Sequence, residues 1–249
     1  MIRIHVSSVL TIKDAFLGQE LKRNEIYFVL DKYPCYPEQR PGGNYILTNL
    51  APGSHSLTIS GVNFEDENLE IIATDNGFEE YIVNMRPNGS YRFGTRVRSV
   101  EFAFVEKASK MPLPGIEVCL TRPGMAEMKI AQDIVPEGAV EMRVYFRGNQ
   151  NRLKLPAQFL ISDGEGAEVC VLRDLENDIG RLGKPLRMAH MRGRTLTGCQ
   201  VFRTDEKGVV KLYYSALQPI EVLVESKGHF AKIDVDDDND RYIVEIDSH

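Results

Sequence analysis

The 249-residue sequence lacks the features that mark two large classes of binding protein. No apolar run approaches the ~20 residues that a membrane-spanning helix needs. No strongly basic stretch is present, and a net charge of −6 gives none of the electrostatic signature of a nucleic-acid-binding protein. We therefore expect partners other than a membrane or a nucleic acid.

The N-terminus lacks the apolar segment of a secretory signal. Its sequence, MIRIHVSSVLTIKDAF, alternates between apolar and polar side chains instead. This pattern favours synthesis in the cytoplasm. The chain would then stay there, become part of an assembled particle, or leave by a route that needs no signal peptide.

Motifs for metal, redox and nucleophilic chemistry are also missing. The cysteines show no CxxC spacing, which argues against a zinc site and favours buried free thiols. They are Cys35, Cys119, Cys170 and Cys199. The histidines form neither HxH nor HExxH, and there is no GxSxG elbow and no P-loop. The sequence therefore predicts no catalytic residue and no cofactor other than the calcium ion considered below.

His190, within PLRMAHMRG, is the most suggestive of the histidines. A metal site needs converging ligands, and none is apparent around it. The favoured interpretation is structural, with the imidazole bonded to a backbone carbonyl in a turn.

The sequence does contain a series of short strand patterns. Apolar and polar residues alternate with period two in runs separated by turns such as PGG and APG. The clearest early runs are 2–6, 26–30, 45–47, 55–59 and 69–72. Helical periodicity is weak, with one turn at most expected at 172–177 and at 216–219. Strands spaced in this way are typical of a β-sandwich or small barrel, so we predict an all-β fold.

The strand pattern occurs twice along the chain. In the first copy GGNYIL and LAPG lead into the strand 54–60, and in the second TDEKGVVKL and LQP lead into the strand 220–226. A closing pair of strands follows in both copies. We therefore expect two domains, residues 1–90 and 91–249.

These motifs resemble the prealbumin-like sandwich of carboxypeptidase regulatory-like domains and collagen-adhesin B-type repeats. The resembling parts are the D-x-x-G-x-(Y/V)-x-L element and the Leu-x-Pro-(Gly) turn before an x-L-x-(I/V)-S strand. The resemblance implies two tandem prealbumin-like (Ig-like) β-sandwiches.

The second copy contains an insertion at about 123–202, with strand patterns at 141–146 and 158–162. A segment of this length without structure of its own is uncommon, so we predict a β-rich subdomain. Its pattern L-x-x-P-L-x-x-x-H-x-x-G, from Leu182 to Gly193, resembles a short element of phage-tail and bacterial surface proteins.

An acidic run, DVDDDND, occupies 234–240. Hard oxygen ligands at alternating positions are typical of calcium sites, and here they would be Asp236, Asp238 and Asp240. The run lacks the glycine and the final glutamate of an EF-hand loop and lies between two strand patterns. A solvated hairpin turn is the favoured interpretation, and a calcium-binding turn is the alternative.

Collagen-adhesin repeats often carry an intramolecular Lys–Asn isopeptide bond. The resemblance implies Lys13 and Asn84 as its partners, although no catalytic acid can be assigned between them. The Tyr-Arg-Gly-Ser ending of transthyretin-like hydrolases is replaced here by EIDSH, and the paired histidines of intradiol dioxygenases are absent.

The sequence thus predicts a non-enzymatic structural or binding module that acts through protein–protein contacts, with other subunits or copies of itself. The β strands and the resembling element favour a phage-tail-like or contractile injection particle. One alternative is a cell-surface or carbohydrate-binding module, which a glycan groove lined by Tyr33, Tyr36 and Tyr45 would favour. Another is a hydrolase that uses carboxylates of the insertion.

Overall fold

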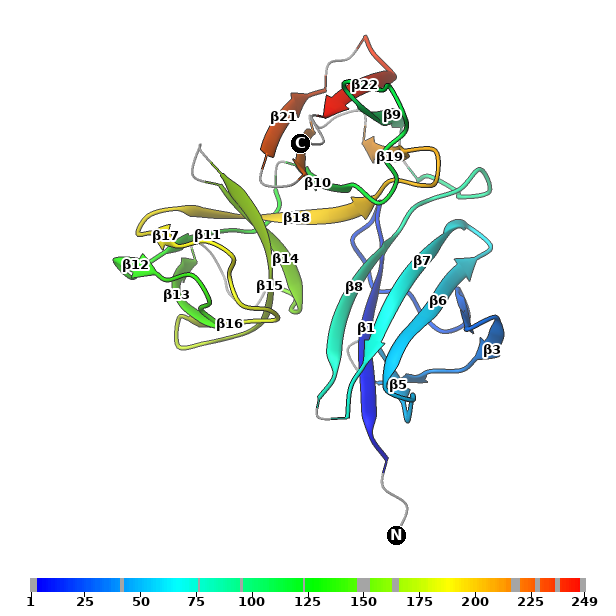
Figure 1. The fold of residues 1–249 in the computed structure, drawn as a ribbon, viewed down its shortest axis with the longest axis horizontal. Coiled ribbons are helices and arrows are strands. Elements are labelled where there is room, and N and C mark those ends of the chain that lie inside the picture. The colour runs from blue at the N-terminus through cyan, green and yellow to red at the C-terminus, as the bar shows by residue number, and fades with distance from the viewer. Residues whose placement is uncertain are drawn as a thin grey trace. The chain divides into compact units, whose positions relative to one another are not determined.

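The computed structural model describes residues 4–40, 43–75, 77–94, 96–122, 124–146, 153–162, 166–215, 220–226, 229–235 and 238–246. These residues form strands and turns and no helix, which confirms the predicted all-β fold (Figure 1). Nothing in this part of the chain forms a helix long and apolar enough to cross a membrane. The chain divides into two compact units, Met1–Thr95 (unit 1) and Arg96–His249 (unit 2).

Unit 1 contains eight described strands. They are β1 (Val6–Asp14), β2 (Tyr27–Leu30), β3 (Tyr33–Cys35), β4 (Glu38–Gln39), β5 (Asn44–Thr48), β6 (Gly53–Gly61), β7 (Phe64–Ala73) and β8 (Glu79–Met85). They form two sheets with the orders β4-β5-β1-β8 and β3-β2-β6-β7. Both sheets contribute side chains to one core, which includes Leu10, Tyr45, Phe28 and Ile59. Unit 1 is therefore a β-sandwich.

The first strand of unit 1 lies later than the sequence pattern suggested. The structure begins β1 at Val6, whereas Ile4 is exposed and residues 2–3 lie outside the described part. Leu10 and Ile12 are fully buried, so the alternation that matters runs through VLTIKD. β1 pairs antiparallel with β5 and parallel with β8, with Ile12 opposite Val83.

Unit 2 contains fourteen described strands. They are β9 (Val97–Glu106), β10 (Glu117–Thr121), β11 (Glu127–Ile130), β12 (Ile134–Val135), β13 (Glu141–Phe146), β14 (Ala157–Ser162), β15 (Ala167–Glu176), β16 (Ile179–Leu182), β17 (His190–Met191), β18 (Thr195–Arg203), β19 (Val209–Ser215), β20 (Glu221–Ser226), β21 (His229–Asp234) and β22 (Arg241–Ile246). The helical turn expected at 172–177 is wrong, because Leu172–Glu176 belongs to β15. The turn expected at 216–219 falls outside the described residues.

The strand order of the unit 1 sandwich recurs in unit 2. The sheet β19-β9-β22 corresponds to β5-β1-β8, and β18-β10-β20-β21 corresponds to β3-β2-β6-β7. The parallel pairing recurs as well, because β22 runs parallel to β9 as β8 does to β1. The insertion follows β10 and returns through β18, at the place where unit 1 passes directly from β2 to β3.

The insertion forms a closed six-stranded barrel. Its order is β11-β13-β16-β15-β14-β18, and β18 pairs back onto β11. All these pairs are antiparallel. The interior is apolar and contains Met128, Val144, Phe159, Leu172 and Leu196. The barrel is therefore a packed core of its own.

Strand β18 belongs to both parts of unit 2. Its residues 195–199 pair with β11 and β14 in the barrel, and its residues 200–203 pair with β10 in the sandwich. In Figure 1 this yellow-orange strand passes from the barrel into the sandwich. The predicted end of the insertion at 202 thus falls inside β18.

The D-x-x-G motif forms a tight turn before β19. The carboxylate of Asp205 accepts hydrogen bonds from the backbone N–H groups of Lys207 (2.9 Å) and Val209 (2.8 Å). Gly208 has φ +71°, and a Cβ there would lie 2.6 Å from the carbonyl oxygen of Phe104. Only glycine fits this backbone conformation and this close approach.

Candidate functional site

The three tyrosines whose groove would have favoured a carbohydrate-binding module do not share one exposed surface. Tyr33 and Tyr36 are exposed, at 75% and 78%, but Tyr45 is fully buried. Tyr45 lies in the core of unit 1, where its hydroxyl donates to the carbonyl oxygen of Leu21 (2.9 Å). Tyr45 shares a strand face with the buried Leu47, so the alternation itself turns it inward.

A pocket nevertheless lies beside the exposed tyrosines. Its volume is about 360 Å³, within the range of small-ligand sites. The described residues that line this tyrosine pocket are Arg23, Ile26, Tyr27, Phe28, Val29, Pro34, Cys35, Tyr36 and Pro37. Sequence analysis missed Arg23 and Tyr27. Alternation in the YFVL strand could have identified Tyr27, because Tyr27 is exposed next to the buried Phe28 and so points to the opposite face of the sheet.

The hairpin that carries much of this pocket is held by His55. Asp31 and Lys32, with φ 49° and 72°, form the tight turn between β2 and β3. The Asp31 carboxylate lies 2.6 Å from His55 Nδ1 and accepts the N–H of Ser56 (2.9 Å). His55 Nε2 lies 2.7 Å from the carbonyl oxygen of Ala51.

Both ring nitrogens of His55 therefore face acceptors. A neutral imidazole has one N–H, so only the protonated ring can donate to both. The carbonyl of Ala51 and the carboxylate of Asp31 accordingly raise the pKa of His55, and His55 and Ser56 lower the pKa of Asp31. The contacts of His55 thus help to fix the turn between β2 and β3.

Glu168 and His190 form a buried pair at the barrel of unit 2. His190 Nε2 lies 2.6 Å from a carboxylate oxygen of Glu168, and both residues are at most 2% exposed. The expected backbone-carbonyl partner of His190 is therefore wrong, because its partner is a carboxylate. His190 Nδ1 is buried and has no hydrogen-bond partner among the described residues.

The Glu168 carboxylate holds the segment 184–190, which we call the strap. It accepts the backbone N–H groups of Arg187 (2.9 Å) and Met188 (3.2 Å) in addition to the His190 bond. Burial raises the pKa of Glu168, but these hydrogen bonds and the nearby imidazole outweigh burial and hold the pKa below its usual value. Leu186 of the strap reaches the barrel core. These contacts account for Glu168 and His190 as structural groups.

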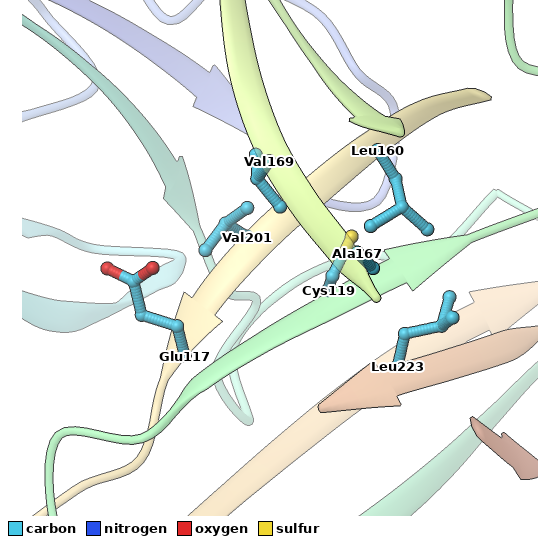
Figure 2. Close-up of a pocket in the computed structure, with 7 residues that line it drawn as sticks. All are labelled: Glu117, Cys119, Leu160, Ala167, Val169, Val201 and Leu223. Carbon is cyan, nitrogen blue, oxygen red and sulfur yellow. The ribbon is translucent and has the colours of Figure 1, made fainter. Parts of the chain in front are cut away.

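A second pocket lies over strands β10 and β18 and is mainly apolar (Figure 2). The residues that line it are Glu117, Cys119, Leu160, Ala167, Val169, Val201 and Leu223. Its volume of about 20 Å³ has room for about one water molecule. The Glu117 carboxylate is bonded to the Arg203 guanidinium at 2.7 Å. This pocket is too small for an organic ligand.

The four cysteines of the chain are free thiols. Cys119, which lines this pocket, is buried, as are Cys170 and Cys199, and Cys35 in unit 1 is half-buried. Burial raises the pKa of the Cys199 thiol well above its usual value, and a hydrogen bond with Cys119 adds to this shift. Thiols of this kind react slowly because little thiolate forms.

The acidic turn is only partly described. Asp236 lies outside the described residues, while Asp238 and Asp240 are exposed. The Asp240 carboxylate lies 3.7 Å from the Arg98 guanidinium. Within the described ranges no group of three or more His, Cys, Asp or Glu side chains could hold a metal ion. The calcium-binding turn stays a prediction.

Lys13 and Asn84 are direct partners in the parallel pairing of β1 with β8. Their neighbours Ile12 and Val83 face the core, so Lys13 and Asn84 lie on the opposite, outer face of the sheet. Lys13 also pairs with Glu20 in an isolated bridge. The isopeptide bond stays a prediction, which an intact mass lower by one ammonia would establish.

No protein-family model matches the chain, and no curated protein matches it. Solved structures similar to it include a Streptococcal ancillary pilin (10% identity, TM-score 0.24) and the Bacillus anthracis TIE protein (12%, 0.26). The alignment with the ancillary pilin covers 97% of this chain and 61% of the pilin, and the alignment with the TIE protein covers 98% of this chain and 51% of that protein. The major pilin subunit of Bacillus cereus is similar at 9% identity and TM-score 0.28, and the alignment covers 98% of this chain and 99% of the pilin. TM-scores this low mean that the fold assignment depends on the strand topology above.

Proposed function

We propose that the chain is a non-enzymatic structural module that acts through contacts with other protein subunits. The observation that supports this is the duplicated sandwich, in which one strand order is used twice and a packed barrel is inserted in the second copy. Such a framework presents rigid edges and loops for contact with other proteins. The buried polar pair of Glu168 and His190 holds the strap within the framework.

The strand edge of β22 is a candidate contact surface. β22 pairs with β9, and no described strand pairs with its other edge. Ile243 in its middle is 69% exposed. Open edges with exposed apolar side chains are surfaces on which further strands can pair.

Two settings suit this module. The first is a phage-tail-like or contractile injection particle assembled in the cytoplasm, and the second is a cell-surface structure. In either setting the partners are other subunits or copies of the same chain, and closed symmetry would limit the assembly.

The hydrolase alternative requires two carboxylates that face one cleft. Among the described acids of the barrel, Glu168 is buried against the strap, whereas Glu141 and Asp174 are exposed beside Arg181. Neither of the two pockets described above is lined by a pair of described acids. The structural proposal is therefore favoured.

Light scattering after size exclusion, over a range of concentrations, tests the proposal. We expect the full chain to form a defined oligomer or to co-purify stoichiometrically with a neighbouring subunit. Ile243→Lys should weaken that association, because a charge at a strand edge opposes pairing. Val62→Lys, at a turn position that is 78% exposed, is the matched control. A chain that stays monomeric and never co-purifies with another subunit would contradict the proposal.

A further inference from the structure

Among the described residues of the tyrosine pocket, aromatic walls are combined with one cationic group, Arg23. The rings of Tyr27 and Tyr36 are exposed at its rim, and Ile26 and Phe28, each 5% exposed, form apolar lining beneath. Pro34 and Pro37 add flat apolar surface. Arg23 lies on the turn 22–25, which is fixed by hydrogen bonds from the N–H of Glu25 to the carbonyl of Lys22 and from the N–H of Lys22 to the Glu25 carboxylate.

The guanidinium and the two tyrosine hydroxyls among the described lining residues can each donate a hydrogen bond. Arg23 donates only, and the hydroxyls of Tyr27 and Tyr36 can donate. The described residues of the lining include no carboxylate and no side-chain amide. A proline-rich segment in the polyproline II conformation has the complementary chemistry, because its carbonyl oxygens are unpaired and its prolines have no N–H.

Pairing of a peptide strand with β3 is disfavoured at this edge. The tight turn makes Leu30 and Tyr33 a hydrogen-bonded pair, so the next pair, Val29 and Pro34, directs its backbone groups outward. Pro34 has no N–H to offer to an added strand. A ligand here must therefore bind mainly through side-chain surfaces, as polyproline segments do in aromatic grooves.

We propose that the tyrosine pocket binds a proline-rich segment of a partner protein in the polyproline II conformation, with an acidic group of the segment beside Arg23. The assignment deepens the proposed function, since it gives the chemical class of one partner. The turn between β2 and β3 and the His55 contacts hold the pocket wall in place before binding, which lowers the entropic cost of association.

Calorimetric titration of the full chain with an oligoproline peptide ending in two aspartates tests the proposal. We expect saturable binding at least about tenfold tighter than for a glycine–serine peptide with the same ending, because polyproline II is already extended. Tyr36→Ser should weaken binding about tenfold or more. Tyr33→Ser, which changes an equally exposed tyrosine outside the lining, should leave it unchanged. Circular dichroism would verify that both variants fold.

Arg23→Gln separates the charge contribution. It should weaken the aspartate-bearing peptide about fivefold and leave an amidated oligoproline without aspartates unaffected. The proposal is overturned if no saturable binding is seen at millimolar peptide, or if Tyr36→Ser binds as well as the parent. It is also overturned if a cello-oligosaccharide binds in a Tyr36-dependent way and the peptide does not. None of these results bears on the light-scattering test of subunit association. Peptide binding and subunit association can therefore be refuted independently of each other.

Discussion

At the scale of single residues, two histidines differ in how many hydrogen-bond acceptors surround them. His55 faces an acceptor at each ring nitrogen, at 2.6 Å and 2.7 Å, whereas His190 faces one acceptor, Glu168. The sequence showed both as isolated histidines. Their carboxylate partners lie at distant positions in the sequence, which no local pattern encodes.

The His55 contacts should make the stability of unit 1 depend on pH. The folded-state pKa of His55 is raised, so its stabilisation is complete below the unfolded pKa of about 6.5 and is lost as pH rises through the folded pKa. Asp31 acts in the opposite sense, because its pKa is lowered and its contribution is lost in acid. Urea midpoints measured at pH 6 and pH 9 should differ more for the parent than for His55→Gln.

His5→Gln is the control for this measurement. His5 Nε2 lies 2.9 Å from the carbonyl oxygen of Thr74, and no carboxylate contact of the kind that His55 makes is seen for it among the described residues. The variant should keep the pH dependence of the parent. An identical pH dependence in the parent and in His55→Gln would show that His55 is not protonated in this way.

Glu168→Gln should destabilise the chain by about 3 kcal/mol, because the site supplies three donors and needs an acceptor at both oxygens. A glutamine amide group would place N–H against one of those donors. The parent should also lose stability as pH falls through the folded pKa of Glu168, which lies below its usual value. Chemical denaturation measures both effects.

Glu141→Gln is the matched substitution on the barrel surface. Glu141 pairs with Arg181, and both side chains are more than half exposed. A change of less than about 0.5 kcal/mol is expected there. Equal effects of the two substitutions would rule out a special role for the buried carboxylate.

At the scale of elements, turn chemistry was the most readable part of the sequence. The D-x-x-G turn and the glycine before β5 appear where the motifs placed them, and Gly43 has φ +76°. Alternation located most strands, but it placed the first one too early, because 2–6 alternates as clearly as the true β1. The same alternation also tells which face of the sheet each side chain lies on. Tyr45 is two residues from Leu47, so it should lie on the same buried face.

Gly208→Ala should cost about 2–4 kcal/mol, since the added Cβ combines a left-handed φ with a backbone clash at 2.6 Å. Gly138→Ala is the matched control. Gly138 has φ +80°, but a Cβ there would meet nothing within 4 Å, so about 1 kcal/mol is expected. Thermal or urea unfolding gives the stability lost by each variant, and the difference between the two losses is the cost of the clash beyond that of the backbone strain. Equal losses would mean that the turn before β19 relaxes.

Closure of the barrel was not predictable from the sequence. It depends on the pairing of Met128 with Leu196, which lie far apart in the chain. Each strand of the insertion has the same short pattern, and such patterns do not specify which strand pairs with which. The sequence therefore indicated a β subdomain without its topology.

At the scale of the whole molecule, the boundary between the units can be tested by truncation. Tyr91 follows the boundary predicted at residue 90, yet its hydroxyl donates to Asp14 (2.6 Å) and its ring contacts Phe64 and Phe93. A fragment of residues 1–95 should fold cooperatively and exceed 1–90 in stability by about 2 kcal/mol. Thermal unfolding by circular dichroism measures the difference. Equal stability would place the end of the unit before Tyr91.

The parallel pairing of the first and last strands has a mechanical consequence. In unit 1, β1 and β8 are joined from Ser8–Glu79 to Asp14–Met85, and β9 and β22 are joined in the same way in unit 2. Tension applied through the two ends of either unit would load these hydrogen bonds in shear, all at once. A hairpin pulled from its open end gives way one bond at a time. Each unit should therefore resist stretching between its two ends more strongly than such a hairpin would.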